Sequence, residues 1–204
     1  MNENQQIYQI LSAFISVNPR PIFEGDWMKN GSAFRTFTDE VGQFLAGLKV
    51  VDYYAQPLPS AVDERLYEIV VRFMRGTAVD HTTFQDSLAP EQRAVFGIYG
   101  HRAATLAVRL NSRDWLLSGL VGAVIANYTI PQKRNVEVSL AVYHHCAQKI
   151  GAAPQALFAE AARFAQPELA EKLAAFGQRT DVNLKQFGWQ EQKTPDGVRY
   201  KFSW

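Results

Sequence analysis

The chain has 204 residues, of which 47% are hydrophobic and 20% charged, a composition that suits one large globular domain or two small ones. A formal net charge of +1 removes the compositional argument for a nucleic-acid-binding protein. A single cysteine, Cys146, excludes an internal disulfide and any multi-cysteine zinc site within one chain. The first residues place no basic segment ahead of an apolar core, so we expect no signal peptide and a cytoplasmic location.

The first 85 residues predict an N-terminal helical part that packs on the rest of the chain. Apolar side chains recur at helical spacing from Asn4 to Val17, which predicts a first helix. Most of residues 21–40 shows neither a helical nor a strand period and favours a loop. A helix capped by Thr38 is expected to run to Lys49.

Two further segments complete this N-terminal part. The run VVDYYA at residues 50–55 reads as strand or irregular structure. Ser60, followed by Asp63 and Glu64, supplies a side-chain acceptor and negative charge at a helix N-terminus. We therefore expect a helix after Ser60 that ends at Gly76.

A run without charged side chains extends from Trp115 to Gln132. A membrane span needs about 20 predominantly apolar residues, and this run is interrupted by polar residues and a proline, so it predicts a buried helix and no membrane segment. Gly119, Gly122 and Ala126 share the side opposite the large apolar residues. We expect this small-residue side to let a neighbouring helix approach closely.

Residues 86–204 predict a helical stack followed by a hairpin, and the two parts are expected to form one compact domain. Three consecutive helices are predicted from Pro90 to Gly151, with breaks near Asn111 and Thr129, and two shorter ones over 154–165 and 167–178. Their short connections imply antiparallel neighbours. The predicted fold class is all-α, a stacked array of α-hairpins.

The last residues change character. FGWQEQK and VRYKFSW flank TPDG, whose Pro-Asp-Gly order is typical of a turn, so a short terminal β-hairpin is expected. Isolated hairpins are marginal in water. We therefore expect Trp189, Tyr200, Phe202 or Trp204 to dock on the helical body.

Histidine and cysteine are the first candidates for chemistry. His144 and His145 are adjacent, and neighbouring helical residues point about 100° apart, which argues against a shared metal ion. The sequence favours a partly buried His144 with one hydrogen bond, and it places the His145 ring away from Cys146. No nucleophile, phosphate-loop or metal-ligand motif is present. We therefore assign no catalytic residue, no metal and no cofactor.

Two arginines offer a different possibility. Arg102 and Arg109 lie on one flank of the helix predicted from Pro90, two turns apart. Ion pairs with nearby carboxylates would make them structural, and the partners within reach in sequence are Asp86, Glu91 and Asp114. The alternative is a ligand or anion site formed by Arg102 and Arg109 with His101 or His144.

The C-terminal part resembles a group of uncharacterised bacterial helical proteins. The shared features are the LAVR helix end, the WL..GL helix, the LF.EAA helix and a GW…PDG.RY tail, and they cover roughly the last 115 residues, a domain-sized unit. At the start of the third helix, where the resemblance leads us to expect a tryptophan and acidic residues, this chain has Lys133, Arg134 and Asn135. The resemblance implies an all-helical body with this tail and assigns no functional residue.

Two functional hypotheses follow from the sequence. The first is a non-enzymatic cytoplasmic protein that binds another macromolecule, such as an adaptor or an immunity-type protein, because helical stacks present faces that suit protein recognition. The second is a small-molecule enzyme or anion-binding protein that uses the arginines and histidines named above. The expected partner is another protein, not nucleic acid or membrane, and self-association is left open.

Overall fold

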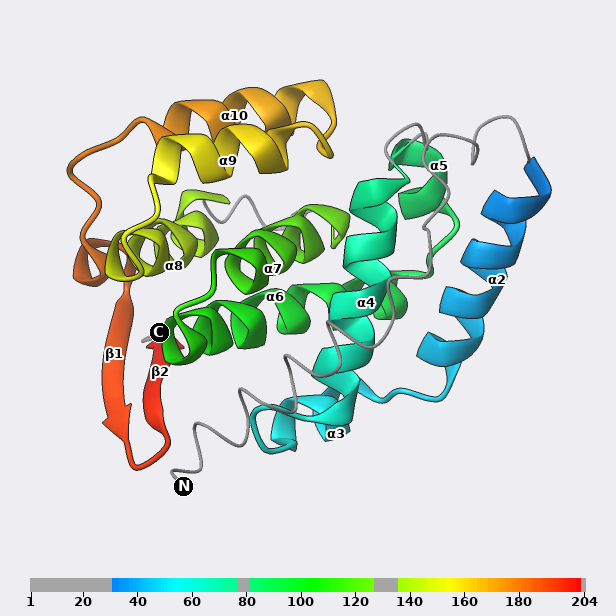
Figure 1. The fold of residues 1–204 in the computed structure, drawn as a ribbon, viewed down its shortest axis with the longest axis horizontal. Helices are drawn as coiled ribbons and strands as arrows, with labels where there is room; N and C mark the ends of the chain where they lie inside the picture. The colour runs from blue at the N-terminus through cyan, green and yellow to red at the C-terminus, as the bar shows by residue number, and fades with distance from the viewer. Residues whose placement is uncertain (1–30, 77–80, 127–135, 203–204) are drawn as a thin grey trace.

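The computed structural model describes residues 31–76, 81–126 and 136–202, which form a mainly helical fold with a C-terminal two-stranded antiparallel hairpin (Figure 1). The helix predicted from Asn4 lies outside the described residues. The elements in chain order are α2 Gly31–Ala46, α3 Val50–Ala55, α4 Ala61–Arg75, α5 His81–Asp86, α6 Pro90–Leu110, α7 Arg113–Ile125, α8 Val136–Lys149, α9 Pro154–Ala162, α10 Pro167–Gly177, the 3₁₀ turn η1 Leu184–Phe187, β1 Trp189–Thr194 and β2 Gly197–Phe202.

The closely packed pair α6 and α7 forms the centre of the molecule. In Figure 1, α2 to α5 lie towards the right of this pair, α8 and the hairpin lie towards its left, and α9 and α10 lie above it. Every residue of α7 from Trp115 to Ile125 is buried, as expected for a helix that is apolar on all sides. Among the described residues, no helix is long and apolar enough to cross a membrane.

Glycines bring α6 and α7 into close contact, which confirms the prediction for the small-residue side of α7. A Cβ atom added at Gly119 would lie 2.9 Å from Ala103 Cβ, and one added at Gly122 would lie 2.8 Å from Tyr99 Cδ1. A Cβ atom added at Gly100 of α6 would lie equally close to the Gly119 carbonyl oxygen, at 2.8 Å. Side chains larger than hydrogen at these positions would force the two helices apart.

The N-terminal part differs from the sequence prediction in two places. Helix α2 begins at Gly31 and ends at Ala46, so much of the segment expected as loop is helical, and Thr38, the expected cap of a helix to Lys49, lies inside the helix. Residues 50–55 are helical, and the strand or irregular reading is wrong. A six-residue helix shows too little of the 3.6-residue period for its pattern to be recognised, and the burial of Tyr53 among the helices decides its conformation.

The start and end of α4 agree with the prediction. Ser60 Oγ accepts a hydrogen bond from the Asp63 backbone N–H, and the Asp63 side chain accepts one from the Ser60 N–H, which together form a capping box. The helix is followed by Gly76 at its C-cap. Asn111, the predicted break between α6 and α7, has the left-handed conformation with φ of 49° that ends helices.

The hairpin forms and docks as predicted. Its strands pair with Thr194 opposite Gly197 across the two-residue turn. The Trp189 side chain is buried, and its Nε1–H donates to the Val138 carbonyl oxygen of α8 at 2.6 Å. Tyr200 is half-buried against the core.

Candidate functional site

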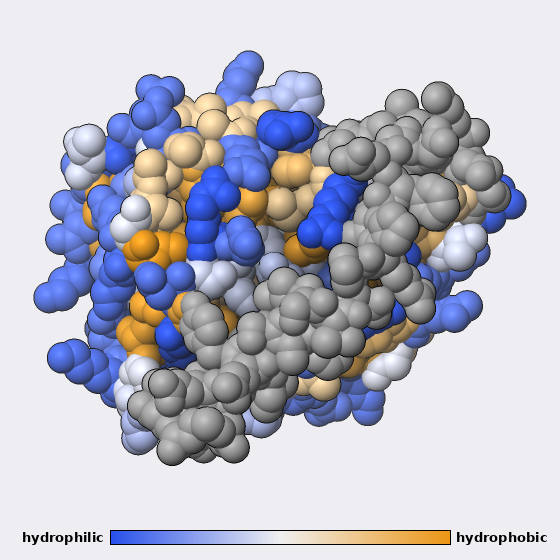
Figure 2. Space-filling model, viewed as in Figure 1, coloured by the Kyte–Doolittle hydropathy of each residue, from blue (hydrophilic) through white to orange (hydrophobic). Residues whose placement is uncertain are grey.

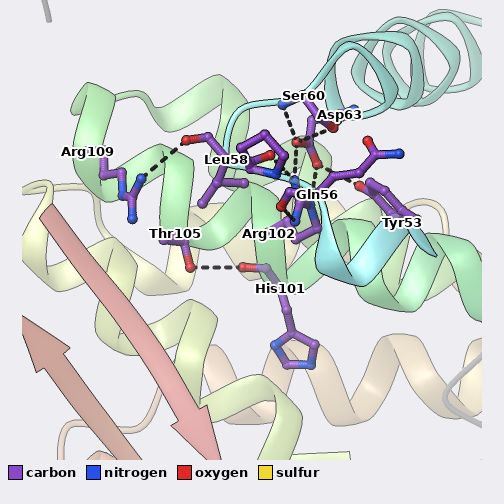
Figure 3. Close-up of polar contacts among 10 residues, drawn as sticks. Tyr53, Gln56, Leu58, Ser60, Asp63, His101, Arg102, Thr105 and Arg109 are labelled. Carbon is purple, nitrogen blue, oxygen red and sulfur yellow. Dashed lines mark hydrogen bonds and ion pairs between the residues drawn. The ribbon is translucent and has the colours of Figure 1, made fainter. Parts of the chain in front are cut away.

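A buried ion pair joins α4 and α6 (Figure 3). Arg102 Nε and Nη2 donate to Asp63 Oδ1 and Oδ2 at 2.7 and 2.6 Å, a bidentate pair, and the hydroxyl of Tyr53 donates to Oδ1 at 2.7 Å. Asp63 is fully buried and Arg102 is buried. Burial and the neighbouring Asp63 carboxylate raise the pKa of Tyr53, which keeps its hydroxyl protonated as a donor.

The remaining hydrogen-bonding capacity of this pair is directed at the loop between α3 and α4. Arg102 Nη1 donates to the Gln56 carbonyl at 3.0 Å and Nη2 to the Pro57 carbonyl at 2.8 Å. Ser60 donates to Asp63 Oδ2 through both its N–H and its hydroxyl. Burial opposes the positive charge on Arg102, but the hydrogen bonds to Asp63 and its negative charge outweigh this effect and raise the pKa of Arg102. The guanidinium of Arg102 is therefore engaged in structural contacts within the protein.

The sequence pointed to the wrong partners for Arg102. Asp86, Glu91 and Asp114 are near it along the chain, whereas Asp63 is 39 residues away and comes from α4. The sequence placed Ser60 and Asp63 at the start of a helix, but the pairing of the Asp63 carboxylate with Arg102 depends on how α4 packs against α6.

Arg109 lies two turns further along α6, where the hairpin meets the loop after α3. Its Nε and Nη2 atoms donate to the Val198 carbonyl at 3.4 and 3.3 Å. Its Nη1 atom donates to the Leu58 carbonyl at 3.4 Å, as Figure 3 shows. Within the described part of the chain, no carboxylate lies within ion-pair distance of Arg109. Its structural contacts are therefore hydrogen bonds to carbonyl groups and not the predicted ion pairs. Burial lowers the pKa of its guanidinium.

His101 points to the opposite side of α6 from Arg102 (Figure 3). Its ring lies under the hairpin, with centroid distances of 5.1 Å to Trp189 and 6.1 Å to Tyr143. Its Nδ1 atom is buried and has no hydrogen-bond partner among the described residues. Burial lowers the pKa of His101 to about 4, so the ring is neutral near pH 7.

His144 of α8 packs against the α9–α10 pair. Its side chain is fully buried, its Nε2 atom lies 2.9 Å from the Arg179 carbonyl oxygen, and its ring centroid lies 6.0 and 5.9 Å from those of Phe158 and Phe176. Because the carbonyl accepts, Nε2 carries the proton, and burial lowers the pKa of the ring. The predicted single hydrogen bond is confirmed, and the burial is complete instead of partial.

Cys146 and His145 are neighbours in sequence but have separate surroundings. The Cys146 thiol is fully buried, and burial raises its pKa to about 12, so the thiol stays protonated near pH 7. His145 Nε2 lies 3.2 Å from Glu191 Oε2, and Lys149 Nζ donates to Glu191 Oε1 at 2.6 Å. Glu191, which the sequence did not single out, thus ties β1 to α8.

The four predicted ligand residues therefore occupy separate places. Arg102 belongs to the α3–α4 anchor, Arg109 to the hairpin junction, His101 to the core under the hairpin and His144 to the α9–α10 interface. In the described ranges, no group of three His, Cys, Asp or Glu side chains is arranged to hold a metal ion.

The exposed face of α3 is the most unusual surface of the described chain. Val51 and Tyr54 are 77% and 73% exposed, and they stand out as the exposed large hydrophobic residues of the described segments. Their i, i+3 spacing places them on one side of the helix. Most of the rim of the face drawn in Figure 2 is hydrophilic, as expected for a surface in contact with water.

Comparisons with protein-family models, with curated proteins and with solved structures find no match to this chain.

Proposed function

We propose that this protein is a non-catalytic binding protein that recognises another protein through the exposed side of α3. The exposure of Val51 and Tyr54 carries the proposal, because large apolar side chains left in water on a rigid element are typical of recognition sites. The polar side chains first considered for catalysis support it, since the described structure distributes them among separate packing contacts.

The network around Arg102 gives α3 the rigidity that recognition needs. Tyr53, between the two exposed residues in sequence, is fully buried and donates to Asp63. Arg102 binds the carbonyl groups of Gln56 and Pro57, directly after the helix. A helix fixed at its buried side and at its C-terminal end loses little further conformational entropy on binding.

The chemistry of the expected partner follows from this side of α3. Tyr54 offers a flat ring with a polar tip, a side chain enriched among residues that dominate binding energy. Asp52, the residue after Val51, is also exposed. We therefore expect a partner surface with an apolar recess for the Tyr54 ring and a basic or hydrogen-bond-donating rim.

The test begins with affinity capture by the full chain, followed by mass spectrometry and titration of the purified partner. A Val51→Ser, Tyr54→Ser double variant should weaken binding roughly 30-fold or more, as for the loss of about 2 kcal/mol at a binding hot spot. The control is a Gln155→Ser, Glu171→Ser variant, which alters exposed positions on α9 and α10. Equal affinity of both variants for the same partner would refute the α3 site.

A second function, binding of a small anion, is supported by the environment of Arg109. Its guanidinium is half-buried, and its hydrogen bonds to carbonyl groups are long, at 3.3 to 3.4 Å. A phosphate or carboxylate would form shorter charge-assisted bonds with the same nitrogen atoms. Anion-dependent thermal stabilisation that is lost in Arg109→Gln would favour this function.

A further inference from the structure

The two edges of the C-terminal hairpin have different surroundings. The edge of β2 faces α6, where Arg109 donates two hydrogen bonds to the Val198 carbonyl oxygen. Figure 1 shows β1 on the outer side of the hairpin, away from α6. Among the described elements, the main neighbours of β1 are β2 and the turn η1.

The pairing register identifies which backbone groups point outward from β1. Lys193 is opposite Val198, and Glu191 is opposite Tyr200. Because the Val198 carbonyl points to Arg109 and away from β1, the Lys193 pair is one without mutual hydrogen bonds, and so is the Glu191 pair two residues further on. The N–H and C=O groups of Glu191 and Lys193 therefore point to the outer edge.

This outer edge is open along the middle of β1. Apart from the pairing with β2, no backbone hydrogen bond involving Glu191 or Lys193 is found within the described segments. The edge thus presents two donors and two acceptors in an extended row. Such a row is a template for a further strand.

We propose that the outer edge of β1 pairs antiparallel with β1 of a second copy of this chain, with Gln192 of each copy on the two-fold axis. Glu191 of each copy then lies opposite Lys193 of the other and exchanges both backbone hydrogen bonds with it. The result is a four-stranded antiparallel sheet in the order β2, β1, β1, β2. The proposal is independent of the α3 site.

The charges of Glu191 and Lys193 favour a second copy of the chain as the partner strand, and they favour one register of the pair. When the open backbone groups of Glu191 and Lys193 pair with the same groups of a second copy, the two-fold axis passes through Glu191, Gln192 or Lys193. An axis at Glu191 or at Lys193 would place two like charges directly opposite each other, which destabilises a strand pair. An axis at Gln192 places two unlike pairs opposite each other. A single six-residue strand pair buries little area, so the dimer should be weak and concentration-dependent.

A cysteine placed on the two-fold axis tests the register directly. At position 192 the two copies would be directly opposite in a pair without mutual hydrogen bonds, with Cα atoms about 4.5 Å apart, within the range of a disulfide. Gln192→Cys should therefore form a covalent dimer under mild oxidation, seen on a non-reducing gel. The native Cys146 is buried and does not compete.

Gln190→Cys is the matched control. It introduces the same thiol on the same exposed side of the same strand, but in the proposed register it lies opposite Thr194 of the second copy, more than about 10 Å from its own copy. It should remain monomeric under the same oxidation. Equal cross-linking of both variants, or of neither, would overturn the proposal.

Charge reversal gives a second, reversible readout by sedimentation velocity of the full chain. Lys193→Glu places like charges opposite each other and should weaken self-association roughly tenfold, whereas Lys201→Glu, the same change on β2, should not. A chain that stays monomeric at every concentration, or a dimer insensitive to Lys193→Glu, would contradict the pairing.

Discussion

Replacing Arg102 by Met should destabilise the protein strongly while preserving the side-chain volume. The substitution leaves the buried Asp63 carboxylate with Tyr53 and Ser60 as donors but without its counter-charge, and it removes the donors to the Gln56 and Pro57 carbonyls. Breaking a buried ion pair from one side costs about 3–5 kcal/mol. For a chain of this size that corresponds to a fall in melting temperature of roughly 6–20 °C.

The measurement is urea unfolding of the wild type, Arg102→Met, Arg102→Lys and a surface control, Arg113→Met. Arg113 pairs with Glu160, and both side chains are more than a third exposed. Because exposed ion pairs contribute little, Arg113→Met should lose less than about 1 kcal/mol of the free energy of unfolding. Arg102→Lys keeps the charge but not the planar fork, so its free energy of unfolding should lie between those of the wild type and Arg102→Met. A loss in Arg102→Met no larger than in Arg113→Met would show that the Asp63 pair does not anchor α3.

Three other predictions concern separate parts of the structure. Gly122→Leu should lower the melting temperature by overpacking α7 against Tyr99, at a cost of about 1–3 kcal/mol, and an unchanged melting curve would show that the helices tolerate separation. If Arg109 is only structural, phosphate should stabilise the wild type and Arg109→Gln equally in a thermal-shift assay. The pKa of His101 is lowered in the folded protein from 6.5 to about 4, so the unfolded chain binds the proton first, and stability should fall as pH decreases from about 6.5 to 4. His101→Phe should reduce this pH dependence of the free energy of unfolding, measured against His145→Phe as control.

The sequence predicted those elements whose signals are local. Several local signals are found where expected: the helix start at Ser60, the break at Asn111, the prolines that open α6, α9 and α10, and the Pro-Asp-Gly turn. Each of them acts over a few residues. Helix α3 was missed because its conformation depends on the burial of Tyr53. The pairing of Arg102 with Asp63 was missed for the same reason, since it depends on the packing of α4 against α6.

The contacts of the candidate site residues also depend on packing and not on their positions in the sequence. Arg102 and His101 are neighbours in sequence and looked like parts of one site, yet they leave α6 in different directions and serve different contacts. His101, Trp189 and Arg109 hold the hairpin by its buried face and by its β2 edge, and Glu191 holds it to α8. A hairpin fixed in this way cannot relieve its open β1 edge by folding back on the helices. The contacts that stabilise the hairpin thus also keep its outer edge extended and accessible to another strand.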